Sequence, residues 1–219
     1  MKAAIFDLDG TILDSMHVWR DIDIRFLAKR GFEVSRDYIE QVSSMGFEES
    51  ARFTIQRFGL KERAEDIQKE WFDMAIDAYT NDVLLKPHAK EYLEYLGEEG
   101  IKIAAATSSD SALVLPALKN NKIFHLFDEI VTVREVERGK GFPDIYIHAA
   151  KKLKVPISDC VVFEDIIKGI IGAHDGGFYA IAMEDTNSCS EKERMQAEAD
   201  AYIVDFAEMM RPFHLHNRF

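Results

Sequence analysis

Short apolar runs and helical patterns alternate along most of the chain. Between the apolar runs, residues recur three or four positions apart, as on one face of a helix. Because strands that alternate with helices form parallel sheets covered on both faces, the pattern predicts an α/β fold with a three-layer, Rossmann-like parallel sheet core. The predicted strands are Ala3–Phe6, Ile101–Thr107, Glu129–Val133, Cys160–Phe163, Tyr179–Met183 and Ala201–Val204, and the predicted helices are Ala89–Glu99, Ser111–Asn120, Pro143–Lys152 and Ile166–Asp175.

One long stretch, from about Asp14 to Asp82, departs from this alternation. It shows helical periodicity without a convincing strand, and three glycines divide it. We therefore expect an inserted all-helical cap domain at residues 14–82 and an α/β core domain at residues 1–13 and 83–219. The tail, residues 211–219, has no clear period and is expected to pack or fray at the surface.

The charge of the chain limits its partners. With 39 Asp and Glu against 27 Lys and Arg, the formal net charge of the 219 residues is -12. Such a chain repels nucleic acid and anionic lipid, so we expect neither as a partner. An anionic substrate then needs a local cation or a cluster of donors. We expect a small-molecule substrate, and a monomer or weak homo-oligomer.

Cysteine usage and the first residues bear on the compartment. Cys160 and Cys189 are too few and too distant for a disulfide framework or a zinc site, which fits a reducing compartment. The apolar residues before Asp7 are too few for a signal peptide, and no run approaches the roughly 20 residues of a membrane span. We expect a cytoplasmic protein.

Three of the predicted strands end in polar residues that packing does not explain. They lead into Asp7-Leu8-Asp9-Gly10-Thr11, into Thr107-Ser108-Ser109 and into Glu164-Asp165. In open parallel sheets, ligands bind beyond the carboxyl ends of the strands. We therefore expect these three endings to converge on one site.

The first ending contains two carboxylates, Asp7 and Asp9, directly before a glycine turn. Such a pair repels unless a cation or a shared proton intervenes. Oxygen ligands favour a hard ion, and Mg²⁺ is the usual partner of carboxylates and a substrate phosphate. An EF-hand is excluded because the third acid, the glycine at position 6 and the closing glutamate are missing. Considered alone, either aspartate has an alternative explanation, which is that its side chain caps a turn.

The segment from Asp7 to Thr11 resembles the first signature of the haloacid dehalogenase superfamily, in its phosphatase form. The resemblance implies that Asp7 attacks phosphorus and becomes an aspartyl phosphate. It implies that Asp9 protonates the leaving oxygen and then activates water. Gly10 and Thr11 are expected beside the phosphate.

The same resemblance assigns the other polar endings. Thr107 takes the place of the hydroxyl donor to the phosphoryl group, Ser108 offers its backbone amide, and Ser109 is expected beside them. Lys140 matches the lysine of the third motif, whose ammonium neutralises the nucleophile and the phosphoryl oxygens. Taken alone, a lysine in a loop is usually solvated, so this role depends on its neighbours.

The acidic fourth motif completes an implied Mg²⁺ site. Asp165 is expected to be a direct ligand and Glu164 to reach the metal through water. The site residues implied for the metal are Asp7, Asp9, Glu164 and Asp165. Two positions depart from the family pattern, which often has Pro and Ser where this chain has Gly141 and Ile166.

The resemblance extends to the branch of β-phosphoglucomutases and sugar-phosphate phosphatases with a C1-type helical cap. Asp9 argues against dehalogenation, because dehalogenases lack an acid/base there. A mutase must hold a second phosphate with cap cations, whereas Ser43 and Phe47 stand at the apparent Lys and Arg positions. We therefore expect a phosphoric monoester hydrolase acting on a small sugar or polyol phosphate. The alternatives are a β-phosphoglucomutase-type mutase and a non-catalytic protein that binds phosphate compounds.

Substrate contacts from the cap are the least defined. Met45, Gly46 and Phe47 could close over a substrate, since a glycine beside an apolar pair suits a lid. His17 is a second candidate for the substrate wall. For all of these side chains, packing within the cap is the alternative.

Overall fold

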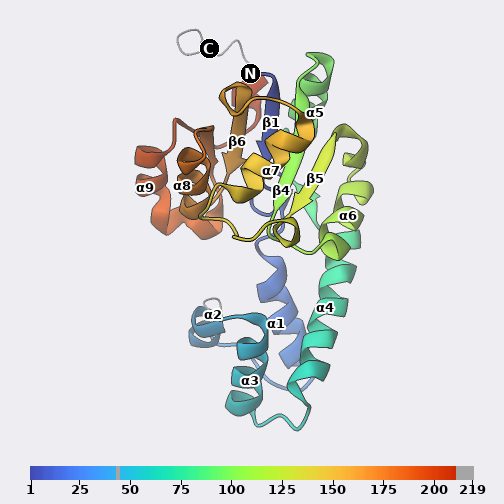
Figure 1. Cartoon of the computed structure of the whole chain (residues 1–219). Coiled ribbons are helices and arrows are strands. Elements are labelled where there is room, and N and C mark those ends of the chain that lie inside the picture. Colours follow the sequence, from blue (N-terminus) through green and yellow to red (C-terminus); the bar gives the residue numbers. More distant parts are fainter. Residues whose placement is uncertain (43–44, 211–219) are drawn as a thin grey trace. The chain divides into compact units, whose positions relative to one another are not determined.

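The computed structural model describes residues 1–42 and 45–210, with only the backbone of Asn187 and Cys189. Ser43, the side chain of Cys189 and the tail 211–219, which the sequence analysis considered, lie outside the described residues. The chain forms two compact units (Figure 1). We call residues 1–16 with 83–219 the α/β unit, and residues 17–82 the helical unit.

The α/β unit contains a six-stranded parallel sheet in the order β5-β4-β1-β6-β7-β8. Each strand lies within one residue of its predicted bounds, and the predicted α/β fold with a parallel sheet is confirmed. The strands are β1 (Ala3–Phe6), β4 (Lys102–Thr107), β5 (Glu129–Thr132), β6 (Cys160–Glu164), β7 (Tyr179–Met183) and β8 (Ala201–Ile203).

Helices cover both faces of this sheet. The face that carries Ala3 and Ile5 forms one buried cluster with α7, α8 and Met195. On the other face Phe6 contacts Tyr92 of α5 and Phe206, which precedes α10. Figure 1 shows α7 lying across β1, β4 and β5, which it contacts. The helices of the unit are α5 (Ala89–Glu98), α6 (Ser111–Asn120), α7 (Asp144–Leu153), α8 (Ile167–Asp175), α9 (Lys192–Glu198) and α10 (Ala207–Met210), with 3-10 turns at Phe124–Leu126, Val133–Glu135, Ile157–Asp159 and Thr186–Glu191.

The segments that lead into and out of the helical unit pair with each other. β2 (Leu13–Asp14) and β3 (Leu84–Leu85) form an antiparallel ladder, and the backbone N–H of Lys86 donates to the carbonyl of Ile12 over 2.9 Å. Asp14, which the sequence analysis assigned to the helical insert, is therefore in a strand. A strand of two residues is too short to show an alternating pattern.

The helical unit consists of α1 (Val18–Ala28), α2 (Arg36–Val42), α3 (Phe47–Phe58) and α4 (Ala64–Asn81). Its packing is centred on α4, which contacts both α1 and α3. Within the described residues, no helix of either unit has the length and apolar character needed to cross a membrane.

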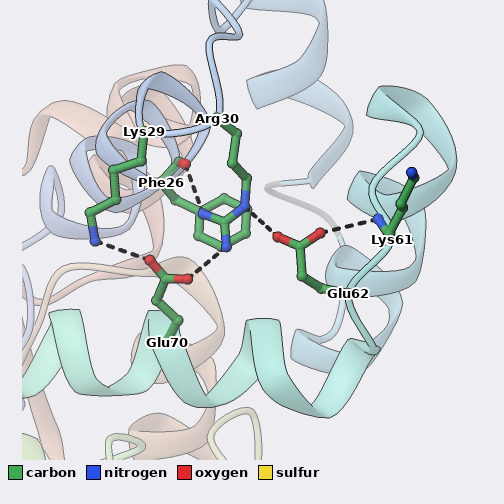
Figure 2. A network of polar contacts seen from close by, with 6 residues as sticks. All are labelled: Phe26, Lys29, Arg30, Lys61, Glu62 and Glu70. Carbon is green, nitrogen blue, oxygen red and sulfur yellow. Dashed lines mark hydrogen bonds and ion pairs between the residues drawn. The ribbon is translucent and has the colours of Figure 1, made fainter.

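A half-buried arginine connects the end of α1 to α4, as Figure 2 shows. The Arg30 guanidinium donates over 2.7 Å to each of Glu62 and Glu70, and over 3.1 Å to the carbonyl of Phe26. It also lies 3.6 Å above the centre of the Phe26 ring. Lys29 donates to the second oxygen of Glu70 over 3.0 Å. The planar guanidinium of Arg30 donates in these three directions while its face lies on the Phe26 ring, a geometry that the tetrahedral ammonium of lysine does not offer.

A second polar network joins the first three helices of this unit. The hydroxyl of Tyr38 on α2, which is fully buried, lies 3.2 Å from the Asp23 carboxylate of α1 and 2.8 Å from the Thr54 hydroxyl of α3. Thr54 in turn donates to the carbonyl of Ser50 over 2.7 Å. Burial raises the pKa of Asp23 to about 6, and the hydrogen bond from Tyr38 opposes this only in part.

We predict that Asp23→Asn stabilises the protein at neutral pH. Because the folded-state pKa of Asp23 is raised, the protonated carboxyl favours folding. Its contribution to the free energy of unfolding is complete below the unfolded-state pKa and is lost as the pH rises through about 6. Asparagine stays neutral and still accepts from Tyr38, so we expect a gain of about 1–2 kcal/mol at neutral pH and none near pH 4. Urea unfolding at several pH values measures this.

Asp21→Asn makes the same substitution in the same helix at a side chain that is 47% exposed, and it is the matched control, which should gain no stability at neutral pH. A gain for Asp23→Asn that is the same at acid and neutral pH would contradict the interpretation.

Candidate active site

Three neighbouring strands deliver the polar residues to one edge of the sheet. Asp7 follows β1, the central strand of the three, while Thr107 ends β4 and Glu164 ends β6. All three side chains are buried, as is Asp165. Ligand atoms of Asp7, Glu164 and Asp165 lie within 4.8 Å of one another. Two of the three polar endings therefore meet as a single acidic cluster.

Lys140 brings a positive charge into this cluster. Its ammonium forms ion pairs with Asp7 Oδ1 and, at 2.7 Å, with Glu164 Oε1, and its side chain is only 7% exposed. Burial alone would lower the pKa of Lys140, but Asp7 and Glu164 raise it above its ordinary value. The lysine therefore remains charged.

Burial and mutual repulsion shift the pKa values of the three acids in this cluster. Burial raises the pKa of Asp7, of Asp165 and of Glu164, the last to about 7, although Lys140 pulls each down. Glu164 Oε2 is buried and has no hydrogen-bond partner within the described part of the chain. Buried carboxylate oxygens without enough donors suit a hard divalent cation, so these residues fit the implied metal.

Two glycines let the backbone approach these carboxylates closely. A Cβ at Gly10 would lie 2.2 Å from Asp165 Oδ2, and the φ of Gly10 is +81°, a conformation that other residues rarely adopt. A Cβ at Gly169 on α8 would lie 2.4 Å from Glu164 Oε2. Gly10 was predicted from the sequence and Gly169 was not, because a single glycine in a helical pattern carries no specific signal.

Asp9 is not among the three acids whose ligand atoms lie within 4.8 Å of one another, and hydroxyl groups hold its carboxylate. Ser15 donates to Asp9 Oδ1 and Ser109 to Asp9 Oδ2, each over 2.6 Å. The backbone N–H of Ser109 also donates to Thr107 Oγ1 over 3.0 Å. Ser109, expected beside the phosphate, thus contacts Asp9, whereas Ser108 is exposed. Ser15 was not among the residues predicted from the sequence.

Two further hydroxyls reach the acids of the fourth motif. Thr11 Oγ1 is buried and lies 3.4 Å from Asp165 Oδ1, and Tyr146 on α7 donates to Glu164 Oε1 over 2.7 Å. Tyr146 was missed because a tyrosine among the apolar residues of a helix resembles a packing residue.

The backbone accounts for one of the two departures from the family pattern. Gly141 has a φ of +104°, which proline cannot adopt because its ring fixes φ near about −65°. Ile166 stands in extended conformation before α8, and no side chain caps that helix. Its carbonyl accepts from the N–H of Gly169 over 3.0 Å, so the turn forms without a hydroxyl at this position.

The candidate substrate residues from the insert belong to the helical unit. His17 is exposed before α1, and Met45 and Gly46 precede α3. The Phe47 ring lies 5.6 Å from that of Trp19 and 5.8 Å from that of Trp71, and Phe47 is 39% exposed. Phe47 therefore takes part in packing within its own unit, and a role of these residues in substrate binding stays a prediction.

Comparison with known proteins identifies the family. A family model described as haloacid dehalogenase-like hydrolase matches residues 4–183, so the chain belongs to this family. A probable pseudouridine-5'-phosphatase of Drosophila melanogaster is 28% identical over 208 residues, which cover 92% of this chain and 90% of the relative. The predicted family and the predicted enzyme class, a phosphoric monoester hydrolase, are confirmed.

A β-phosphoglucomutase of Bacillus subtilis is 31% identical over 199 residues, which cover 84% of this chain and 83% of the relative. Among solved structures, a candidate β-phosphoglucomutase of Thermotoga maritima superimposes with a TM-score of 0.85 at 24% identity, covering 93% of this chain and 94% of that one. The structural likeness confirms the fold.

We predict that Gly169→Ala lowers the rate of phosphate ester hydrolysis. The added methyl group overlaps the Glu164 carboxylate and must displace it, so kcat for p-nitrophenyl phosphate should fall about tenfold or more. Gly97→Ala is the matched control, because Gly97 also lies in a helix but has open space around its Cα. The control should keep full activity; full activity of Gly169→Ala as well would refute the close approach.

We also predict that Mg²⁺ changes the pH dependence of stability. Without metal, the pKa of Glu164 is raised, so its protonated form favours folding. This contribution to the free energy of unfolding is complete below the ordinary glutamate pKa and is lost as the pH rises through about 7. Metal binding requires the deprotonated acids, so Mg²⁺ should stabilise the protein more at pH 8 than at pH 6. Thermal unfolding with chelator and with Mg²⁺ measures this, and a Mg²⁺ effect that grows as the pH falls would contradict it.

Proposed function

We propose that the protein is a Mg²⁺-dependent phosphatase that hydrolyses a small phosphate monoester through an aspartyl-phosphate intermediate. The observation that carries this proposal is the position of Asp7: a buried carboxylate directly after β1, paired with Lys140 and clustered with two further acids. Asp9, two residues on, offers a second carboxylate for proton transfer.

In the first step, a carboxylate oxygen of Asp7 attacks phosphorus and the bond from phosphorus to the ester oxygen breaks. The electron pair goes to that oxygen, which takes the proton of the Asp9 carboxylic acid and leaves as an alcohol. Lys140 balances the charge of Asp7 and of the phosphoryl oxygens. Thr107 and the amide of Ser108 are the proposed phosphoryl donors.

In the second step, Asp9 acts as the base. It takes a proton from water, whose oxygen attacks phosphorus and displaces the Asp7 carboxylate, so that inorganic phosphate is released. Ser15 donates to one oxygen of the Asp9 carboxylate and Ser109 to the other, which limits the rotation of the carboxylate. Both steps depend mainly on positioning and charge stabilisation.

Asp7, Asp165 and Glu164 would hold the Mg²⁺, and Asp9 belongs to the predicted ligand set. When bound, the ion neutralises the phosphate and the acids around it. We include a cytoplasmic location and a monomer or weak homo-oligomer in the proposal; the net charge of -12 supports a small-molecule substrate rather than nucleic acid or an anionic membrane surface.

We propose a sugar or polyol phosphate as the substrate. The two relatives described above are named for a nucleoside 5'-phosphate and for a glucose phosphate, and the second keeps a phosphosugar mutase as the alternative. Phe47 stands at the apparent Arg position of the mutases, which need cap cations for a second phosphate, and this difference supports hydrolysis. The nearby Arg52 is already paired with Glu48 at 2.6 Å.

Phosphate release with Mg²⁺ across sugar, polyol and nucleoside monophosphates tests the proposal. β-Glucose 1-phosphate with its bisphosphate activator runs in parallel. Release of phosphate from one class identifies a phosphatase and its substrate group. Formation of glucose 6-phosphate without net phosphate release would identify the mutase, and ligand binding without turnover would identify a binding protein.

We predict different defects for the two aspartates. Asp7→Asn should form no phosphoenzyme and show no turnover, because an amide is not a nucleophile. Asp9→Asn should still bind substrate but turn over about 10²–10⁴-fold more slowly, because the leaving group and the attacking water lose their proton partner. Acid-quenched phosphoenzyme and steady-state phosphate release measure these effects, and wild-type turnover of Asp7→Asn would refute the mechanism.

A further inference from the structure

A buried tyrosine lies next to the acidic cluster, outside the residues that the proposed reaction uses. Tyr146 is 0% exposed, and its hydroxyl donates to Glu164 Oε1 over 2.7 Å. It belongs to α7, which begins four residues after Lys140 and packs on β1, β4 and β5. The tyrosine therefore approaches Glu164 from the helix layer rather than from the sheet.

Glu164 Oε1 is shared by two donors. Tyr146 Oη and Lys140 Nζ each lie 2.7 Å from it. A carboxylate oxygen accepts through two lone pairs, so these two donors satisfy it and fix the rotation of the carboxylate. The other oxygen, Oε2, is buried and has no hydrogen-bond partner in the described residues. The two oxygens of Glu164 therefore have different surroundings, because both donors lie at Oε1.

We propose that Tyr146 is a positioning residue: by occupying Glu164 Oε1 together with Lys140, it holds the other Glu164 oxygen available to a divalent cation and fixes the Lys140 ammonium beside Asp7. A phenol suits this role because it adds a donor without adding a charge to an already charged cluster. The expected effect on Mg²⁺ binding follows from the contacts of Tyr146 and Lys140 with Glu164. The expected effect on turnover rests on the proposed phosphatase function.

Packing is the competing explanation for Tyr146. Its ring meets that of Phe178 edge to face at 6.2 Å, within the buried cluster under the sheet. The two explanations separate because phenylalanine keeps the ring and loses only the hydroxyl. Conversely, Phe178→Leu removes the ring contact and keeps the hydrogen bond to Glu164.

The test is calorimetric titration of the purified full chain with Mg²⁺, together with kcat and KM for p-nitrophenyl phosphate. We expect Tyr146→Phe to weaken Mg²⁺ binding about tenfold and to lower kcat by a similar factor, with a smaller change in KM. Tyr92→Phe, a second buried tyrosine of the same unit that lies among aromatic rings, is the matched control and should change neither quantity. Phe178→Leu should lower the thermal midpoint and leave the Mg²⁺ affinity unchanged.

Mg²⁺ affinity and kcat of Tyr146→Phe within about twofold of the parent protein would overturn the inference, as would an equal loss of affinity in Phe178→Leu. Failure of the proposed function has a different signature. In that case the parent protein releases no phosphate from any ester, while Tyr146→Phe still weakens Mg²⁺ binding.

Discussion

The main physical constraint on the α/β unit is the burial of three carboxylates near a single lysine. Removing a carboxylate from water costs several kcal/mol unless charges or donors replace the water. Lys140 satisfies Asp7 and one oxygen of Glu164, and Tyr146 and Thr11 add hydroxyls. Burial, together with repulsion among the acids, raises the pKa values of Asp7, Glu164 and Asp165, and a divalent cation would offset both effects.

The sheet makes this cluster possible by giving it a rigid base. Phe6 and Phe163, the residues directly before Asp7 and Glu164, stack with ring centres 4.5 Å apart. Tyr92 and Phe206 pack against both rings from the helix layer. Because β1 and β6 are paired in register with Phe6 opposite Phe163, the acids that follow them are held side by side.

The sequence predicted those parts of the site that follow strands. A charged residue such as Asp7 or Glu164 at the end of an apolar run departs from the pattern of a buried strand. This departure is visible within a few neighbouring residues of the sequence. Tyr146 and Gly169 lie in helices, where a tyrosine or a glycine has several ordinary explanations. Their roles depend on contacts with Glu164 that only the tertiary structure shows. For the same reason, Ser109 could be placed near the site but not on Asp9.

Calorimetric titration of the chelator-treated protein and of Asp165→Asn with Mg²⁺ tests the central claim most directly, since Asp165 is a buried member of the cluster that is not paired with Lys140. We expect the parent protein to bind one Mg²⁺ and Asp165→Asn, which keeps the shape of the side chain but removes its charge, to bind it at least about tenfold more weakly. A parent protein that binds no Mg²⁺, or a variant that binds it equally well, would contradict a role of the buried acids as a metal site.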